Sequence, residues 1–267
     1  MLLSLSEYPV IAHRGNSAHA PEDTLESLRQ GLALGADAAE FDVRLTRDGH
    51  VVLHHDPAVD RTSDGRGEVR AKSLAELSAL DFGYRFTRDG GATYPWRGRG
   101  IRIVTLEDVL ETFPFERFVL EVKSPEASAE TLRLLARHNA RQRCIVGSFD
   151  LAALAPFRAA GFATGAAREE VVRLLLRSAL PGVVRQVPFQ ALLITPNFRG
   201  LPLPVVRFAR MVRAAGVPTH VWTVDDPRQA QRLWAGGVQG ILSNDPAAIL
   251  RAAGRDPAPM PGGGATA

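Results

Sequence analysis

Two carboxylates separated by a single residue, Glu40 and Asp42, interrupt one apolar run, and His13 and Arg14 end the apolar run before it. In a β-strand, residues i and i+2 point to the same face, so Glu40 and Asp42 would converge on one place. Carboxylate oxygens suit a hard divalent metal, and a histidine and an arginine on a neighbouring strand suit an anionic substrate. The alternative, a solvated strand face, fits poorly because the strand reads as buried and charged residues recur at equivalent places later.

Three later segments place polar groups in the same way. In the run 118–123, Glu121 and Lys123 repeat the i, i+2 spacing and add a third carboxylate and a cation. His55 follows the apolar run 51–53, and Trp222 lies near the end of a late apolar run. Burying these charges is costly unless they pair or bind a metal, so their recurrence at the ends of apolar runs indicates one shared site.

The elements that would position this site are short β-like runs alternating with amphipathic helical patterns, which predict a parallel sheet. Repeated about eight times in a chain of 267 residues, the alternation predicts a (β/α)8 barrel with its site at the carboxyl ends of the strands. A doubly wound open sheet is the alternative, but no Gly-x-Gly-x-x-Gly follows the first strand. The candidate strands end near residues 13, 44, 54, 123, 149, 166, 195, 224 and 243.

These nine candidates are one too many for an eight-stranded barrel. The run 51–54 follows the strand 40–46 across the turn 47–49 with no helix between them. Either a helix is missing from the barrel or one candidate lies outside it. Proline at first turns and glycine after last turns support several of the expected helices. These helices cover residues 22–34, 106–112, 127–138, 151–160, 204–215, 227–234 and 247–252.

Residues 57–100 break this rhythm, because they are rich in Gly, Asp and Arg and contain only a short helical pattern near residues 74–80. Insertions of this type lie over one end of a barrel and shape the substrate entrance. The tail 256–267 consists mostly of Pro, Gly and Ala and is expected to be disordered. We therefore expect one catalytic domain over residues 1–255.

Composition excludes several classes of protein. The net charge is +3, and the arginines are scattered rather than clustered with aromatic residues, so no nucleic-acid face is expected. No apolar run is long enough to span a membrane and no signal-peptide pattern opens the chain, so we expect a cytoplasmic protein without stable membrane insertion. The single cysteine, Cys144, excludes an internal disulfide and is expected to be buried and inert.

A set of short motifs runs through the chain in a fixed order. They are His13-Arg14-Gly15, Pro21-Glu22-Asp23-Thr24, Gly35-Ala36-Asp37, Glu40-Phe41-Asp42-Val43, Thr46-Arg47-Asp48-Gly49, His54-His55-Asp56, Asp60-Arg61-Thr62, Thr105-Leu106-Glu107-Asp108, Glu121-Val122-Lys123, Ser148-Phe149-Asp150 and Trp222-Thr223-Val224. Each motif is weak alone, but the ordered set resembles the glycerophosphodiester phosphodiesterase family. The resemblance covers nearly the whole chain up to about residue 250.

This resemblance implies a metal-dependent barrel enzyme that hydrolyses glycerophosphodiesters, its small-molecule substrates, to glycerol 3-phosphate and an alcohol. It also implies a role at each matching position: one divalent cation, Mg2+ or Ca2+, held by Glu40, Asp42 and Glu121; acid–base catalysis by His13 and His55; phosphate contacts from Arg14 and Lys123. One route that the resemblance implies uses the glycerol's own hydroxyl as the attacking group.

The chemistry of the residues agrees with these roles. A phosphodiester resists attack because its anionic oxygens repel a nucleophile, and a divalent ion with two basic side chains offsets that charge. An imidazole pKa near ~6.5 suits proton transfer at neutral pH. The residues alone do not say which histidine is the acid and which the base.

Some positions allow more than one interpretation. His55 is preferred to His54, because the family histidine directly precedes an aspartate and adjacent strand residues face opposite ways. Glu22 either supports the metal or is a first-turn carboxylate favoured by the helix dipole. Trp222 either packs inside the barrel or contacts the glycerol or alcohol moiety. Asp23 departs from the family, whose members often carry asparagine there.

Two other functions remain as alternatives. Phospholipase chemistry on the same barrel, of the lysophospholipase D or phosphatidylinositol-cleaving type, would need an apolar entrance, for which the insertion offers Phe82, Tyr84, Phe86, Tyr94 and Trp96. A binding module without catalysis would lack at least one metal or acid–base residue, and all of them are present. The preferred alcohol and the oligomeric state cannot be read from the sequence.

Overall fold

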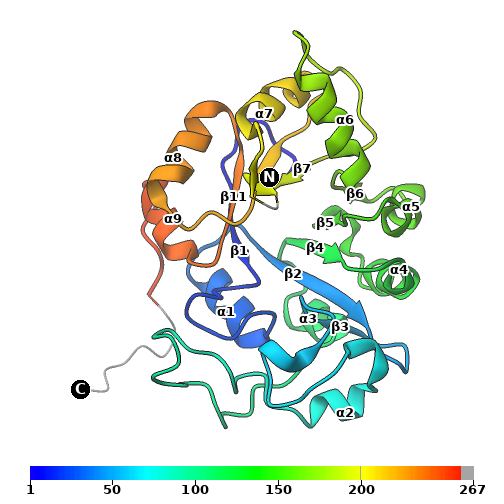
Figure 1. The fold of residues 1–267 in the computed structure, drawn as a ribbon, viewed down its shortest axis with the longest axis vertical. Coiled ribbons are helices and arrows are strands. Elements are labelled where there is room, and N and C mark those ends of the chain that lie inside the picture. Colours follow the sequence, from blue (N-terminus) through cyan, green and yellow to red (C-terminus); the bar gives the residue numbers. More distant parts are fainter. Residues whose placement is uncertain (199, 260–267) are drawn as a thin grey trace.

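In the computed structural model, which describes residues 1–198 and 200–259, eight parallel strands form one curled sheet with helices on its outer side (Figure 1). Their order is β6-β5-β4-β2-β1-β11-β10-β7. The strands are β1 (Val10–His13), β2 (Ala38–Leu45), β4 (Phe118–Val122), β5 (Cys144–Gly147), β6 (Ala163–Thr164), β7 (Leu192–Ile194), β10 (Thr219–Val221) and β11 (Gly240–Ser243). The predicted α/β class with a parallel sheet is confirmed.

The edge strands β6 and β7 do not pair, but three hydrogen bonds link β6 to the residues just before β7. The N–H groups of Gln190 and Ala191, just before β7, donate to the carbonyl oxygen of Thr164 in β6 at 2.9 and 3.2 Å. The side chain of Gln190 also accepts from the Thr164 N–H at 3.0 Å.

The ninth candidate strand lies outside the parallel set. It is β3 (Val51–Leu53), which pairs antiparallel with the end of β2, with Val43 opposite Leu53. The turn 47–49 explains this direction, since a parallel neighbour needs a crossover of about a dozen residues and a short turn allows only a hairpin. Gly49 supplies the positive φ of +87° that the turn requires.

The outer helices follow the predicted pattern closely. All seven predicted helices begin and end within three residues of the predicted bounds. The helices are α1 (Leu25–Ala33), α3 (Leu106–Thr112), α4 (Ser128–Arg137), α5 (Leu151–Ala159), α7 (Val205–Arg213), α8 (Pro227–Gly236) and α9 (Pro246–Ala252). Side-chain caps start several of them; Thr105, for example, bonds the N–H of Asp108 ahead of α3.

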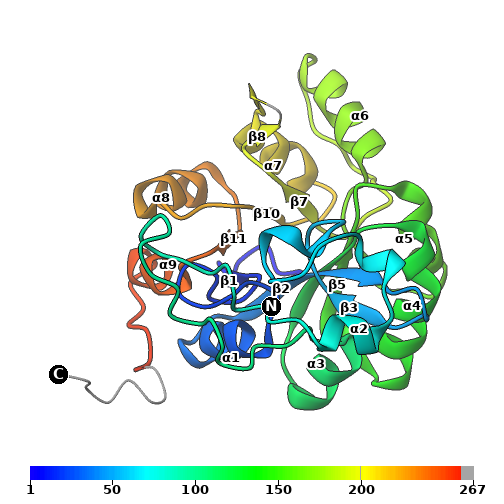
Figure 2. The ribbon, with the colours of Figure 1, turned by 60° about the horizontal axis from the view of Figure 1, so that its bottom comes forward.

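One further helix, α6 (Arg168–Ser178), is not among the predicted ones. It starts after Ala167 instead of a capping Ser, Thr, Asp or Asn, and only Glu170 and Leu174 on it are buried. A short hairpin follows β7 and consists of β8 (Asn197–Phe198) and β9 (Leu201–Pro202). In Figure 2, α6 and β8 project on the same side of the molecule.

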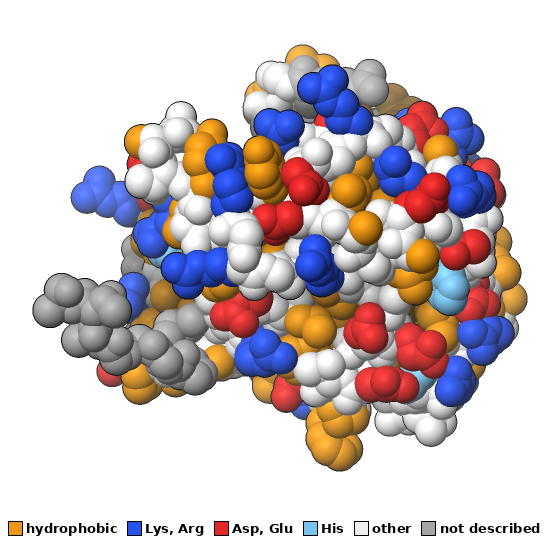
Figure 3. All heavy atoms as spheres, turned by 90° about the horizontal axis from the view of Figure 1, so that it is seen from below, with side chains coloured by type: hydrophobic (Ala, Val, Ile, Leu, Met, Phe, Trp, Pro, Cys, Tyr) orange, Lys and Arg blue, Asp and Glu red, His pale blue; other side chains and the backbone are white. Residues whose placement is uncertain are grey.

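The insertion 57–100 has a small core of its own. It contains η1 (Val59–Arg61), η2 (Val69–Ala71) and α2 (Leu74–Ser78), while two other short 3-10 turns, η3 (Pro125–Ala127) and η4 (Ala140–Gln142), lie beyond it. Val59, Val69, Leu77 and Phe82 pack together against β3. Figure 3 shows the face of the molecule seen from below, where acidic and basic side chains are interspersed.

The last described residues lie against the body of the protein, since the N–H of Ala258 donates to the carbonyl of Leu34 at 3.1 Å. Most of the predicted disordered tail, residues 260–267, lies outside the described residues. Cys144 is 3% exposed, and burial raises the pKa of its thiol to about 12, as expected for an inert cysteine. Among the described helices, none has the length and apolarity needed to cross a membrane.

Candidate active site

Two neighbouring strands bring the predicted carboxylates together. β2 and β4 pair in register with Asp42 opposite Glu121, and β1 places His13 opposite Glu40. Glu40 and Asp42 share the inner face of the sheet, where they are 5% and 1% exposed. The residue between them, Phe41, turns to the outer core and meets Phe118 edge-to-face at 5.2 Å. The i, i+2 spacing therefore places Glu40 and Asp42 on one face of β2, as predicted.

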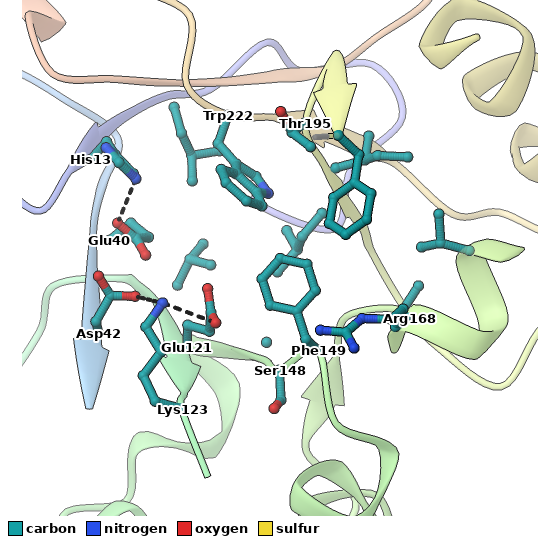
Figure 4. Close-up of a pocket in the computed structure, with 18 of the residues that line it drawn as sticks. His13, Glu40, Asp42, Glu121, Lys123, Ser148, Phe149, Arg168, Thr195 and Trp222 are labelled. Atoms are coloured by element: carbon teal, nitrogen blue, oxygen red, sulfur yellow. Dashed lines mark ion pairs between the residues drawn. The ribbon is translucent and has the colours of Figure 1, made fainter. Parts of the chain in front are cut away.

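Two basic side chains balance this acidic group. The Lys123 ammonium lies between two carboxylates, 2.7 Å from Asp42 Oδ1 and 3.0 Å from Glu121 Oε1 (Figure 4). Arg14 approaches from β1, with its Nε 3.1 Å from Asp42 Oδ2 and its backbone N–H donating to Glu40 Oε2 at 3.1 Å. The cluster thus combines three carboxylates with two cations.

The turn after β1 fixes the position of Arg14. Arg14 and Gly15 both have positive φ angles, +52° and +80°. A Cβ on Gly15 would lie 2.3 Å from the backbone carbon of Ser27 in α1, so only glycine permits this close approach. The Ser27 hydroxyl in turn donates to the Arg14 carbonyl at 2.8 Å. The His-Arg-Gly motif is therefore a tight turn held against the first helix.

Burial and mutual repulsion set the protonation of the carboxylates. Burial raises the pKa of Glu40, and the neighbouring Asp42 raises it further. Burial also raises the pKa of Glu121. For Asp42 the effect of burial is outweighed by Lys123 and Arg14, which lower its pKa. Further positive charge nearby would therefore stabilise the ionised forms of Glu40 and Glu121.

Glu40, Asp42 and Glu121 have the donor chemistry that a hard divalent cation prefers. Asp42 Oδ2 is buried and, apart from its ion pair with Arg14 Nε, has no hydrogen-bond partner among the described residues. An all-oxygen set of this kind suits a hard ion, and a cation there would offset the repulsion that raises the pKa of Glu40. The donor set fits Mg2+ or Ca2+ equally.

The first predicted histidine is held by a chain of hydrogen bonds. His13 Nδ1 lies 2.7 Å from Asn244 Oδ1, and the Asn244 amide donates to Asp225 Oδ2 at 2.9 Å. Because the amide nitrogen bonds Asp225, its oxygen faces the imidazole, so His13 Nδ1 carries the proton and Nε2 is the free base. His13 Nε2 lies 3.7 Å from Glu40 Oε2. Burial, helped by Arg14, lowers the pKa of His13 to about 4.

The second predicted histidine has a carboxylate partner instead. His55 Nδ1 donates to Asp56 Oδ1 at 2.7 Å, and Arg61 Nε donates to Asp56 Oδ2 at 2.6 Å. His55 lines the same cavity as the carboxylate group. The adjacent His54 turns away, is 3% exposed and bonds the Asp56 carbonyl and the Thr62 hydroxyl. This geometry supports the preference for His55 over His54.

Glu22 connects the two sides of the site. It accepts from Arg14 Nη1 at 3.0 Å and forms two bonds of 2.7 Å with Arg61. Burial acts to raise the pKa of Glu22, but Arg61 and Arg14 lower it overall. Glu22 therefore holds two arginines in place. It precedes Thr24, the N-cap of α1, so the alternative of a first-turn carboxylate is wrong.

A cavity of about 170 Å³ joins these groups to an apolar wall. Trp222 lines it and meets Phe149 edge-to-face at 6.0 Å, on the side of the cavity toward Arg168 (Figure 4). None of the described residues lining the cavity belongs to the insertion 57–100. In the insertion, Phe82 is buried and Trp96 donates to the His19 carbonyl. The aromatic residues proposed for an apolar entrance thus lie outside this cavity.

Three residues that orient the histidines were not predicted from the sequence. Arg44 donates twice to the His55 carbonyl, at 3.0 and 2.6 Å, and Arg61 and Asn244 orient the histidines as described. Strand alternation could have found Arg44, which is two residues after Asp42 on β2. No local pattern links Asn244 to His13, since the two residues are 231 positions apart.

A second group of potential metal ligands lies elsewhere. Glu107 and Glu111 of α3 and His138 at the end of α4 come within 4.8 Å of one another. Both glutamates belong to an outer helix, on the opposite side of the sheet from the carboxylates of β2 and β4. This group is separate from the site described above.

The whole chain is similar to known phosphodiesterases. The profile of the glycerophosphoryl diester phosphodiesterase family matches residues 13–248. A glycerophosphodiester phosphodiesterase of Caldanaerobacter subterraneus is 30% identical over 254 residues, covering 90% of this chain and 96% of its own length. A glycerophosphodiester phosphodiesterase of Bacillus subtilis is 29% identical and covers 92% of this chain and 86% of its own length.

A solved structure shows the same similarity in three dimensions. A phosphodiesterase from Oleispira antarctica, in complex with the product sn-glycerol 3-phosphate, superimposes with a TM-score of 0.74 at 28% identity, covering 92% of this chain and 96% of the other. The fold and site define a phosphodiester-cleaving enzyme built on a curled parallel sheet. The chain belongs to the glycerophosphoryl diester phosphodiesterase family, which confirms the resemblance carried by the motifs.

Proposed function

We propose that this protein hydrolyses glycerophosphodiesters to glycerol 3-phosphate and an alcohol with the help of one divalent cation, on a sheet closed into a (β/α)8 barrel. The observation that carries the proposal is the placement of Glu40, Asp42 and Glu121 on two paired strands, where they line one cavity with His13 and His55. Family membership and the product bound to the Oleispira antarctica enzyme support the substrate class. The backbone bonds between β6 and the start of β7 support closure.

The basic residues would bind the phosphate. Arg14 and Lys123 line the cavity beside the carboxylates and are 16% and 9% exposed at their side chains. Fixed positive charges in such a water-poor place stabilise the extra negative charge of the transition state more strongly than water does. Glu40, Asp42 and Glu121 would hold the cation, which supplies Lewis-acid activation of the phosphate.

The partners of the histidines suggest how the proton-transfer roles divide. His13 bonds a neutral amide, and Arg14 adjoins it, so its neutral form is favoured and its free Nε2 is suited to accept a proton from the attacking hydroxyl. Burial lowers the pKa of His55 as well, but its bond to the Asp56 carboxylate acts in the opposite direction and favours the imidazolium, so of the two histidines His55 is better suited to protonate the leaving alcohol. We therefore assign His13 as the base and His55 as the acid.

Glycerol 3-phosphate release from glycerophosphocholine tests this function. We expect turnover by the wild-type protein and a loss of at least about 100-fold in kcat for His13→Asn and for His55→Asn, since each removes a proton-transfer group. His54→Asn is the matched control, because His54 faces away from the cavity, and it should retain most of the activity of the folded protein. Equal losses in all three variants would contradict the assignment.

Two expectations stay predictions. Trp222 is expected to contact the glycerol or the alcohol, since it lines the cavity beside Phe149. The protein is expected in the cytoplasm, acting on small molecules without stable membrane insertion. Fractionation of cells that produce the protein tests the second expectation directly.

A further inference from the structure

The cavity has two chemically different halves. The polar half is formed by β1, β2 and β4 and holds the carboxylates, the basic residues and the histidines. The opposite half is apolar and comes from the loop after β5, from α6, from the segment before α7 and from the end of β10. Its main lining residues are Phe149, Val171, Val172, Leu175, Leu203 and Trp222.

One helix extends this apolar half to the surface. Arg168, Val171, Val172 and Leu175 lie at helical spacing i, i+3, i+4, i+7 on α6, so one face of the helix lines the cavity. On a surface helix such a face normally packs on the core, yet Val172 is 48% and Leu175 is 41% exposed. The wall of the cavity therefore continues as an open apolar surface.

The surroundings of α6 enlarge this surface. Leu180, just after the helix, is 58% exposed, and Leu201 in the β8–β9 hairpin is 68% exposed. Exposed apolar groups that gather in one place, beside a cavity, mark a binding site for an apolar ligand. Figure 2 shows that α6 and β8 project together away from the sheet.

The apolar wall begins beside the carboxylates and basic residues, where a substituent of the substrate would extend from the phosphate. Phe149 and Trp222 lie beside the acidic group, and the Arg168 guanidinium stands 5.6 Å from the centre of the Phe149 ring (Figure 4). A small alcohol bound at the phosphate would cover these first aromatic contacts only. An aliphatic chain would continue along Val171, Val172 and Leu175 and remove them from water.

We propose that the preferred substrates are glycerophosphodiesters carrying one aliphatic chain, which lies along α6. The inference rests on the proposed function and adds no new reaction step. In the net reaction the bond between phosphorus and the leaving alcohol oxygen breaks, the oxygen of a water molecule bonds to phosphorus, and the proton that the water loses is balanced by one delivered to the leaving oxygen. The chain is carried either by the glycerol, as in lysophospholipids, or by the leaving alcohol, as in glycerophospho-N-acylethanolamines.

A chain-length series tests the proposal on the intact protein. One arm compares glycerophosphocholine with hexanoyl, octanoyl and decanoyl lysophosphatidylcholine below their micelle-forming concentrations. The other arm compares glycerophosphoethanolamine with its N-acyl derivatives of the same lengths. A fully buried methylene contributes about fourfold to binding, so even a partly covered chain should raise kcat/KM at least about tenfold from hexanoyl to decanoyl in one arm. The arm that responds identifies which side carries the chain.

Single substitutions on α6 then locate the chain. Val172→Asp places a charge on the cavity wall and should reduce the chain-length dependence at least about tenfold, and the milder Leu175→Ser should reduce it in the same direction. Leu176→Asp is the matched control, because it adds the same charge one helical position away from the cavity-lining face. Hydrolysis of glycerophosphocholine reports whether each variant retains a folded site.

Three outcomes would overturn the inference. Values of kcat/KM independent of chain length in both arms would leave the proposed function intact and refute the chain site. A chain-length effect reduced equally by Leu176→Asp and Val172→Asp would show that the chain does not lie along the cavity face of α6. Absence of hydrolysis with every substrate, including glycerophosphocholine, would refute the proposed function together with this inference.

Discussion

Among the site residues, Lys123 is the one whose substitution should most lower the stability of the metal-free protein. Its ammonium is 2.7 Å from Asp42 and 3.0 Å from Glu121, and its side chain is 9% exposed. Burial alone would lower the pKa of Lys123, but the two carboxylates outweigh it and raise the pKa. Lys123→Met keeps most of the side-chain volume and removes only the charge.

The expected loss is large because the partners are buried. Removing one member of a buried ion pair typically destabilises a protein by about 3–5 kcal/mol, since the remaining charge is left uncompensated. For a chain of 267 residues, at roughly 2 °C per kcal/mol, that corresponds to a fall in Tm of roughly 6–10 °C. Without the lysine, the folded-state pKa values of Asp42 and Glu121 rise, so the loss should be greatest at alkaline pH and shrink as the pH falls and they are protonated.

Thermal unfolding in EDTA between pH 5 and 8 measures this effect. Lys72→Met is the matched control, because it removes the same charge from a partly exposed lysine in the insertion and should change Tm little. A Lys123→Met protein less than about 1 kcal/mol below the wild type at pH 8, or a loss that grows as the pH falls, would refute the reasoning.

Other predictions concern the histidines. Asn244→Asp places a carboxylate against His13 Nδ1. It should raise the pKa of His13 and move the acidic limb of the pH profile of kcat/KM up by about 1–2 pH units. An acidic limb at the same pH as in the wild type would argue against His13 as the base. Gly240→Ala sets a Cβ 2.1 Å from His220 Nδ1 and should lower the unfolding free energy by about 2 kcal/mol or more in urea titrations; unchanged stability would show that the ring is free to move. Burial lowers the pKa of His220 from 6.5 to about 4. Between these pH values the unfolded chain binds a proton that the folded protein does not, so the free energy of unfolding falls by about 3 kcal/mol as the pH drops from 6.5 to about 4. His220→Leu should reduce this dependence of the unfolding free energy on pH.

The sequence was most informative where function depends on local periodicity. The spacing of Glu40, Asp42, Glu121 and Lys123 directly predicts a shared strand face, and the pairing of β2 with β4 brings these residues together. The separation of His54 from His55 follows from the same alternation. Such features depend on neighbouring residues and on the rule that parallel strands end at one edge of a sheet.

Features that depend on distant contacts were not predictable. The bond between His13 and Asn244 spans 231 positions, and the Arg61–Glu22 pair joins the insertion to the loop before α1. The helix α6 lacks a capping residue at Ala167 and buries few of its apolar side chains, so its pattern resembles neither a core helix nor a loop. For an apolar entrance, the sequence pointed only to the aromatic residues of the insertion, and these lie outside the cavity.

The central claim is that a divalent cation at Glu40, Asp42 and Glu121 drives hydrolysis between His13 and His55. Glycerol 3-phosphate release from glycerophosphocholine, measured after EDTA treatment and during titration with Mg2+ or Ca2+, tests it most directly. We predict no turnover in EDTA, full recovery with one of the two ions, and a requirement for about 10–100-fold more metal in Glu40→Gln. Undiminished turnover in EDTA, or a metal requirement unchanged in Glu40→Gln, would contradict the account.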